Sequence, residues 1–265
     1  WIDLFFLPRF QPIEVLKPFL IVMVATILCS NKSSNLYLKY LLSIILISII
    51  SLLLIKQPDI GQTLLVIFLW AVLIFTSGIN IFFLLGFSLF VLVFITYLVI
   101  FVPRFDYIYG RIFSFFNRDA GTHNFQSDKA IESITSGGFF GKGIGEGTLK
   151  NRVPEAHTDY IISVISEEFG VVSIILILLL FLILIYMVFK KINYEKNEKI
   201  KLILIGCVSL ILMQATIHIG VNIRLLPTTG MTLPFLSYGG SSIVSISILS
   251  GMILNLTKRK INQQT

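Results

Sequence analysis

Charged residues are scarce in this sequence. Asp, Glu, Lys and Arg make up 13% of its 265 residues, whereas hydrophobic residues make up 55%. A typical soluble domain carries about 25% charged residues, so this composition excludes an ordinary soluble domain. It predicts an integral membrane protein instead, because a membrane span needs roughly 20 mostly apolar residues in succession.

Cysteine is nearly absent as well. Cys29 and Cys207 are the two cysteines of the chain, and both lie inside apolar segments. This excludes a disulfide framework and a cysteine-ligated zinc site. The net charge of +7 would suit a nucleic-acid partner, but in a membrane protein lysines that set the topology explain it better. No nucleic-acid partner is therefore expected.

The chain also begins without the usual features of a complete membrane protein. It opens WIDLFFLPRF, without an initiator Met, and no signal peptide is visible. We therefore expect a fragment that lacks its N-terminal part.

Apolar runs predict an all-α fold, a polytopic bundle of transmembrane helices in a single membrane domain, 1–265. The longest connector, 102–158, is too polar to cross a membrane, and connectors of this length are usually functional or disordered. Its positive and negative charges nearly balance and it contains aromatic residues and glycines, which favours a folded loop. The seven predicted spans are about 14–30, 38–55, 62–78, 80–101, 159–189, 202–221 and 235–256.

Lysine and arginine predict the orientation of these spans, because cytoplasmic connectors carry an excess of both. Of the short connectors, those after the first and fifth spans, together with the C-terminal segment, hold ten of these residues, and the turn after the third span holds none. The connectors of the other side carry Lys56 and Arg224, with Arg9 before the first span, so the lysine-rich side and the C-terminus are expected in the cytoplasm. The loop 102–158 then faces outward. The ten residues are Lys32, Lys39, Lys190, Lys191, Lys196, Lys199, Lys201, Lys258, Arg259 and Lys260.

One stretch, VPEAHTDYIISVISEEFG at 153–170, places three carboxylates at the start of the longest apolar run. Thr158 or Asp159 could simply cap a helix, where a carboxylate favours the helix dipole. Alternatively, Asp159 is a functional carboxylate at the membrane surface, as ionisable residues in spans often are. Glu167 lies roughly 12 Å along the helix axis from Asp159. Glu168 points nearly opposite Asp159 and is expected to pair with a cation on another helix.

A second stretch, GGFFGKGIGEG at 137–147, is rich in glycine. It matches neither a Walker A motif nor a dinucleotide-binding fingerprint. Glycines let backbone amides approach an anion closely, so a phosphate-bearing ligand is one interpretation. The other is a tight re-entrant turn. Candidate phosphate contacts nearby are Lys142, Lys150 and Arg152.

Two further stretches carry polar residues at span ends. LPTTGMTLPFLSYGGSS at 226–242 contains turn residues and hydroxyls, with Arg224 just before it. Irregular backbone at membrane depth is tolerated where it lines a cavity or is buried in protein. In FQPIEVLKP at 10–18, Glu14 and Lys17 have i,i+3 spacing and could pair. A surface ion pair is the plain alternative for these two residues.

Together these four stretches resemble, in order along the chain, the motifs of the SEDS family (FtsW, RodA and SpoVE). The glycine-rich stretch with its following TLK and the stretch GMTLPFLSYGGSS look closer to the FtsW branch. The chain departs from the usual family pattern at Ile13, where serine is usual, and at Thr229, where lysine or valine is frequent. The family usually has ten spans, so the seven seen here imply that the first three are missing.

The resemblance implies a peptidoglycan glycosyltransferase of bacterial cell division in the cytoplasmic (inner) membrane. It would polymerise lipid II into glycan strands on the extracytoplasmic side and release undecaprenyl diphosphate. Asp159 matches the family's catalytic aspartate, either as a base or as the ligand of a divalent cation, Mg or Mn. The implied partners are a class B penicillin-binding protein, which is a transpeptidase, and other division proteins. The remaining candidates are Lys142, Lys150, Arg152, His157, Arg224, Ser237 and Ser241 for substrate binding and Glu14, Lys17, Glu167 and Glu168 for a supporting polar core.

Two other functions remain open. A lipid II flippase would need a continuous polar path to the cytoplasm, whereas 38–55 and 62–101 hold almost no charge. A non-catalytic scaffold that recruits a transpeptidase would not need Asp159.

Overall fold

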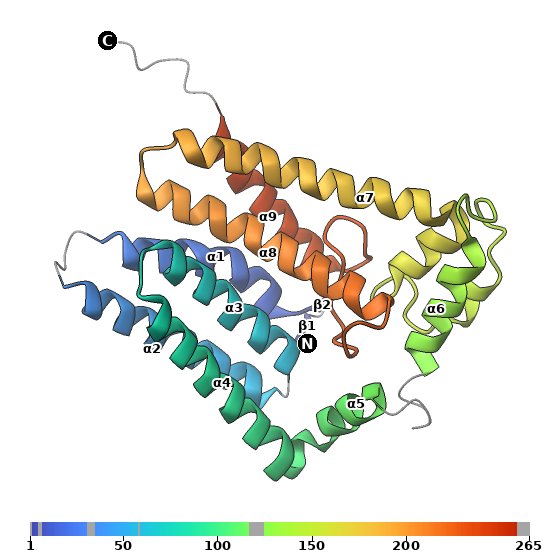
Figure 1. The fold of residues 1–265 in the computed structure, drawn as a ribbon, viewed down its shortest axis with the longest axis horizontal. Coiled ribbons are helices and arrows are strands. Elements are labelled where there is room, and N and C mark those ends of the chain that lie inside the picture. Colours follow the sequence, from blue (N-terminus) through green and yellow to red (C-terminus); the bar gives the residue numbers. More distant parts are fainter. Residues whose placement is uncertain (1, 5–6, 31–34, 58, 117–124, 259–265) are drawn as a thin grey trace.

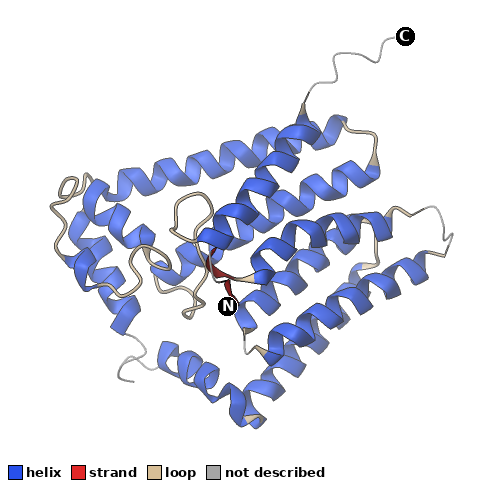
Figure 2. Ribbon diagram, turned by 180° about the vertical axis from the view of Figure 1, so that it is seen from behind, coloured by secondary structure: helices blue, strands red, loops and turns tan. Residues whose placement is uncertain are grey.

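The computed structural model describes residues 2–4, 7–30, 35–57, 59–116 and 125–258. Helices make up nearly all of this part of the chain, and a short antiparallel hairpin of β1 (Ile2–Leu4) and β2 (Leu7–Phe10) precedes them (Figure 2). The predicted helical membrane bundle is therefore confirmed. The hairpin was not predicted.

Each predicted span contains one helix. Five of these helices, α2, α4, α7, α8 and α9, are long and apolar enough to cross a membrane, while α1 and α3 have 17 residues each. The number of segments that cross therefore stays a prediction. The helices are α1 (Pro12–Leu28), α2 (Leu36–Lys56), α3 (Ile60–Thr76), α4 (Ile81–Phe101), α7 (Ile161–Tyr194), α8 (Glu198–Asn222) and α9 (Gly240–Thr257).

Helix α8 forms the centre of the bundle, where it packs against α1, α3, α7 and α9. Its inward side chains, such as Leu204 and Leu210, are almost fully buried. Gly206 allows α1 to approach closely, because a Cβ there would lie 2.6 Å from a side-chain carbon of Ile21. Helix α4 lies at the edge, and Val99 is the residue of this helix that is buried. Most of the other apolar side chains of α4 are left for lipid.

The long connector predicted to be a folded loop is indeed folded. It contains the 3-10 turn η1 (Pro103–Phe105), α5 (Asp106–Phe116), α6 (Phe125–Gly137) and the 3-10 turn η3 (Leu149–Arg152). Helix α6 packs along the beginning of α7 (Figure 1). The loop is thus a helical cap on one end of the bundle.

The two ends of the bundle differ in what they carry. The connection between α7 and α8 and the ends of α1 and α9 lie together at one end (Figure 1). The hairpin, α5, α6 and the segment between α8 and α9 lie at the other end. The lysine-rich connectors expected in the cytoplasm therefore belong to the end opposite the long loop.

Helix α7 is broken near its start. Gly170 has φ 74° and ψ −175°, which is outside helical geometry. The loop supplies the missing hydrogen bonds, since the N–H groups of Val171 and Val172 donate to the carbonyls of Gly138 and Phe139, at 3.0 and 3.3 Å. On the other side of the break, the carbonyl of Glu167 accepts from the N–H of Lys142 at 2.9 Å, and that of Glu168 from Gly143 at 3.1 Å. Irregular backbone is tolerated here because protein partners satisfy it.

Candidate functional site

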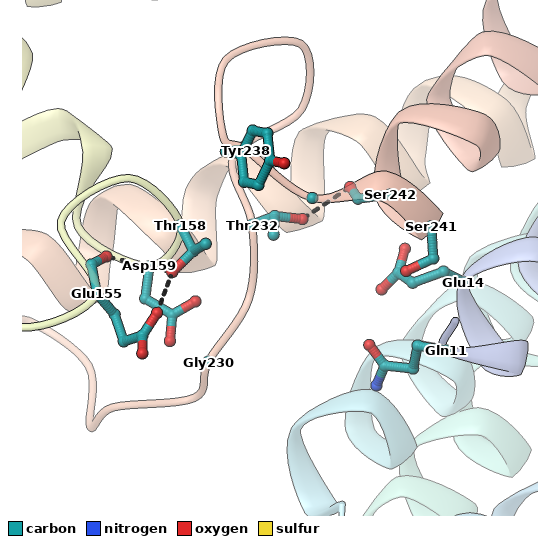
Figure 3. A pocket seen from close by; sticks show the side chains of 11 residues that line it. Gln11, Glu14, Glu155, Thr158, Asp159, Gly230, Thr232, Tyr238, Ser241 and Ser242 are labelled. Carbon is teal, nitrogen blue, oxygen red and sulfur yellow. Dashed lines mark hydrogen bonds between the residues drawn. The ribbon is translucent and has the colours of Figure 1, made fainter. Parts of the chain in front are cut away.

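An acidic cavity of about 410 Å³ opens at the end of the bundle that carries the long loop. Three segments meet there: the start of α1, the residues just before α7, and the turn that leads into α9. Figure 3 shows Asp159 and Glu14 on opposite sides of this cavity. The lining residues are Gln11, Glu14, Glu155, Thr158, Asp159, Gly230, Thr232, Tyr238, Gly239, Ser241 and Ser242.

Asp159 directs its carboxylate into this cavity (Figure 3). It is not a helix cap: the N-cap of α7 is Tyr160, so the capping interpretation of Thr158 or Asp159 is wrong. The backbone of Asp159 is held from two sides, because its N–H donates to the Glu155 carbonyl at 3.1 Å and its carbonyl accepts from Asn222 Nδ2 at 3.0 Å. These bonds fix where the side chain begins.

Gly230 lets the turn before α9 pass close to this carboxylate. Its φ of +67° suits glycine, and a Cβ there would lie 3.5 Å from Asp159 Oδ2. A side chain there would be strained in the backbone, and its Cβ would come into van der Waals contact with the carboxylate.

Burial, the largest cause, and the nearby negative charge of Glu155 together raise the pKa of Asp159 to about 6, against the opposing effect of Arg111. Desolvation disfavours the charged form of a carboxyl group, and a like charge acts in the same direction. A carboxylate with a pKa near neutrality accepts a proton more readily than an ordinary aspartate while staying mostly ionised at pH 7.

Arg111 reaches this region from α5. Its guanidinium donates to the carbonyl of Thr228 at 3.3 Å. It also lines a small cavity of about 50 Å³ together with Asp159 and Gly230. Sequence reasoning missed Arg111 and Glu155, because nothing distinguishes either of them among the charged residues of the loop.

Glu14 and Lys17 form the predicted pair, with 2.7 Å between Lys17 Nζ and Glu14 Oε1. Both residues are buried, so the alternative of a surface ion pair is wrong. Gln62 Nε2 donates to the same oxygen at 2.9 Å, while the buried Glu14 Oε2 accepts no hydrogen bond in the part of the chain that the structure describes. A buried acceptor without a hydrogen-bond partner lowers the stability of the folded protein. An acceptor of this kind beside a cavity, such as Glu14 Oε2, is typical of a site that receives a ligand.

The residues predicted to contact phosphate lie outside the acidic cavity. Lys142 is paired with Glu167 at 3.3 Å, and Lys150 with Glu168. Arg224 is paired with Asp128 of α6, and Arg152 is exposed on η3. None of these four lines the acidic cavity. Their role in binding phosphate stays a prediction.

The glycine-rich stretch packs against α7. A Cβ at Gly137 would lie 1.9 Å from the Ser166 carbonyl oxygen, and one at Gly141 would lie 2.1 Å from that of Glu168. Close packing of two backbones therefore accounts for these glycines. Glu168 pairs with Lys150 of the short 3-10 helix η3, which agrees with the expectation of a cation on another helix.

The remaining candidates divide between two places. Ser241 lines the acidic cavity, whereas Ser237 ties the turn before α9 to the segment before α7 through a 2.6 Å bond to the Thr158 carbonyl. His157 lines a neighbouring cavity of about 610 Å³ with Lys150 and Glu155. Glu155 thus separates two cavities.

A divalent cation would find oxygen donors at this site. The side chains of Glu155, Thr158 and Asp159 line the cavity, and carboxylate and hydroxyl oxygens suit Mg²⁺ or Mn²⁺. Among the described residues, however, no three His, Cys, Asp or Glu side chains converge as a ligand set. A cation bound here would need substrate oxygens or water as further ligands, as Mg²⁺ often does.

The model of the cell cycle protein family FtsW/RodA/SpoVE matches residues 1–262. The chain belongs to this family. The resemblance drawn from the four motifs is thus confirmed, and the chain is a multi-pass membrane protein like other members.

Relatives within the family include two named as probable peptidoglycan glycosyltransferases FtsW. The protein from Caulobacter vibrioides is 35% identical over 254 residues, which cover 94% of this chain and 63% of the relative. The one from Enterococcus hirae is 31% identical over 269 residues, covering 97% of this chain and 67% of the relative. The chain therefore spans about two thirds or less of the length of these relatives.

Two solved structures are similar to the whole chain. One comes from a study of a peptidoglycan synthase complex that coordinates polymerization and crosslinking, with a TM-score of 0.74 and 25% identity over 96% of this chain and 72% of that one. The other is the rod shape determining protein RodA of Thermus thermophilus, with a TM-score of 0.66 and 26% identity over 98% of this chain and 70% of that one. The helical arrangement is that of the family.

Proposed function

We propose that this chain carries the polymerising site of a peptidoglycan glycosyltransferase of cell division. Its substrates would be lipid II, a disaccharide on undecaprenyl diphosphate, and a growing lipid-linked glycan. The observation that carries the proposal is Asp159, a half-buried carboxylate with a pKa raised to about 6 that points into an acidic cavity at the end of a helix bundle of this family. The names of the relatives support the same reaction.

The proposed reaction forms one glycosidic bond and breaks one bond to phosphate. The 4-hydroxyl of the acceptor sugar attacks the anomeric carbon of the donor glycan, its proton passes to Asp159, and undecaprenyl diphosphate leaves with the bonding electrons. Attack opposite the leaving group inverts the anomeric centre. A positioned base of this kind contributes typically 10²- to 10⁴-fold to a rate.

Positive charge must balance the departing diphosphate. Arg111, which lines the small cavity beside Asp159, is one source within this chain. Glu155, Thr158 and Asp159 would hold a divalent cation, Mg or Mn, which would supply further positive charge to the diphosphate. Glu14 and Lys17 would bound the opposite wall of the cavity.

The position of the cavity favours an enzyme over a transporter. Its lining residues come from the ends of elements at one end of the bundle, whereas a flippase needs polar residues along a path to the other end. From the positions of the lysines, we place the cavity on the extracytoplasmic side of the cytoplasmic membrane and the C-terminus in the cytoplasm. A class B penicillin-binding protein is the proposed partner, supported by the similar structure from a complex that couples polymerization to crosslinking.

The decisive experiment replaces Asp159 by Asn in the full-length protein with its partner and follows lipid II polymerisation. The loss of the base should reduce the rate by at least about 100-fold, while membrane level and monodispersity stay unchanged. Asp106→Asn, at an exposed aspartate on α5, is the matched control and should retain full activity. Near-normal glycan synthesis by Asp159→Asn would overturn the assignment.

A further inference from the structure

Glu167 is a fully buried carboxylate in the part of α7 that precedes the break at Gly170, which we call the outer part of α7. Four donors surround it. Ser133 Oγ of α6 lies 3.1 Å away, and the N–H groups of Leu149 and Lys150 in η3 lie 3.0 and 2.6 Å away. Lys142 Nζ, from the glycine-rich stretch, is at 3.3 Å. One side chain therefore joins three separate parts of the long loop to α7.

The part of α7 that Glu167 holds is short. It runs from Ile161 to Phe169, because the helix is broken at Gly170. Asp159 lies just before the first turn of this part and moves with it. Within the turn, Ser163 Oγ donates to the Tyr160 carbonyl at 2.7 Å, and the N–H of Ser163 donates to the same carbonyl at 2.9 Å. Asn222 of α8 and Ser237 of the turn before α9 hold the backbone of Asp159 and Thr158. The helix break leaves the part of α7 that follows Asp159 dependent, in addition, on contacts with the loop.

We propose that Glu167 is a positioning residue: its buried carboxylate fixes the outer part of α7, and with it Asp159, against α6 and the 137–153 part of the loop. This inference rests on the glycosyltransferase function proposed above. It also gives a role to Lys142, which sequence reasoning assigned to a phosphate-bearing ligand: its ammonium group pairs with the carboxylate of Glu167.

The negative charge and the two equivalent oxygens of Glu167 are both needed for this role. Each oxygen accepts from one backbone N–H of η3, and Ser133 and Lys142 add one bond each. Glutamine has the same shape but only one acceptor oxygen. Its NH₂ group would face an N–H donor, and a buried donor would lose its partner.

The test compares Glu167→Gln with Glu146→Gln, the same chemical change at an exposed side chain of the same loop. Both are made in the full-length protein with its partner. Hydrogen exchange of segments 138–153 and 155–165 is measured first, since it does not depend on activity. The kcat and KM of lipid II polymerisation are then measured. Ser133→Ala removes one donor without changing charge and serves as the milder variant if Glu167→Gln does not fold.

The proposal predicts that Glu167→Gln exchanges roughly tenfold faster or more in both segments. It predicts a kcat about 100-fold lower with KM nearly unchanged, since misplacing a catalytic group by about 1 Å costs that much. Glu146→Gln should match the wild type throughout, and Ser133→Ala should show smaller changes of the same kind.

Wild-type exchange in segment 155–165 of the Glu167→Gln or Ser133→Ala variant would overturn the inference. So would faster exchange with an unchanged kcat. If the wild type itself polymerises no lipid II, the proposed function fails. In that case exchange in segment 155–165 alone decides whether Glu167 positions Asp159.

Discussion

At the scale of single residues, the most informative group is the carboxyl of Asp159, because the fold raises its pKa. Asp159 is surrounded by protein on most sides and faces Glu155, and both effects favour its protonated form. A proton acceptor for a sugar hydroxyl benefits from this, because its strength as a base rises with its pKa. The same environment makes the ionised group costly to bury.

The pH dependence of activity should report this carboxyl. With a pKa of about 6, Asp159 loses its ability to accept a proton as the pH falls through 6. Replacing Glu155 by Gln removes a negative charge that raises this pKa, so the acid limb should move to lower pH by a few tenths to one unit. Initial polymerisation rates between pH 4.5 and 8 would show it. A limb that stays in place, or moves upward, would contradict the arrangement of Glu155 and Asp159.

Stability should change in the direction opposite to activity when Asp159 is replaced by Asn. The folded protein binds the proton of Asp159 more tightly than the unfolded chain, where the pKa is near 3.8, so ionisation destabilises the fold as the pH rises from about 4 to 6. Asn carries no charge to bury. The inactive variant should therefore be more stable at pH 7.5, by on the order of 1 to 3 kcal/mol. Thermal unfolding in detergent would test this, and the gain should disappear near pH 4.

The sequence alone revealed Asp159, because a carboxylate at the head of a long apolar run is unusual. It could not reveal Arg111 or Glu155. Each is an ordinary charged loop residue until tertiary packing brings α5 and the segment before α7 together. The same holds for Glu14: Gln62 of another helix donates to its Oε1, and its buried Oε2 has no hydrogen-bond partner among the described residues.

At the scale of elements, α7 shows where pattern reading succeeds and where it stops. Its apolar run predicted one continuous span, and the helix does extend to Tyr194. The break at Gly170 was not predicted, since a single glycine in an apolar run is common in membrane helices. The cause of the break lies in residues 138–143, whose backbone approaches Gly170 too closely for a side chain at that position.

Replacing Gly170 by Ala tests that close approach. A Cβ there would lie 2.2 Å from the Phe139 carbonyl oxygen, and the φ of +74° is unfavourable for alanine. We expect a loss of several kcal/mol of stability, or failure to fold, because both strain and steric overlap act. Gly251→Ala in α9, where a Cβ would meet nothing within 4 Å, is the matched control and should be neutral or slightly stabilising. Thermal melting and yield of the two variants would distinguish these outcomes.

At the scale of the whole molecule, composition predicted the bundle and the lysines predicted its orientation. The lysine-rich connectors and the acidic cavity do belong to opposite ends, which agrees with that orientation (Figure 1). The hairpin and the helices of the long loop were not predicted. Apolar residues recur at helical spacing in α5 and α6, so the sequence carried a signal for these two helices, and contacts with the bundle hold them in place.

Cysteine labelling tests the orientation directly. In a variant without Cys29 and Cys207, a cysteine at exposed Glu146 should react with a membrane-impermeant maleimide in spheroplasts. A cysteine at exposed Lys196, between α7 and α8, should react only after lysis. The reverse pattern would place the acidic cavity in the cytoplasm and would exclude glycan synthesis outside the cell.

The break in α7 also sets the height of the reaction relative to the bilayer. At about 1.5 Å per residue, the apolar stretch from Gly170 to Lys190 matches the roughly 30 Å thickness of a hydrocarbon core. Gly170 then lies at the outer edge of the acyl chains, where exposed Phe139 and Phe140 would meet the layer of lipid headgroups. In the proposed orientation, Asp159 lies beyond that edge, on the side from which the diphosphate of the proposed polyprenyl substrate would approach. The distance between Asp159 and the diphosphate of the proposed substrate should therefore depend on bilayer thickness. A thicker membrane would place the diphosphate farther outward relative to Asp159, and a thinner one would place it farther inward.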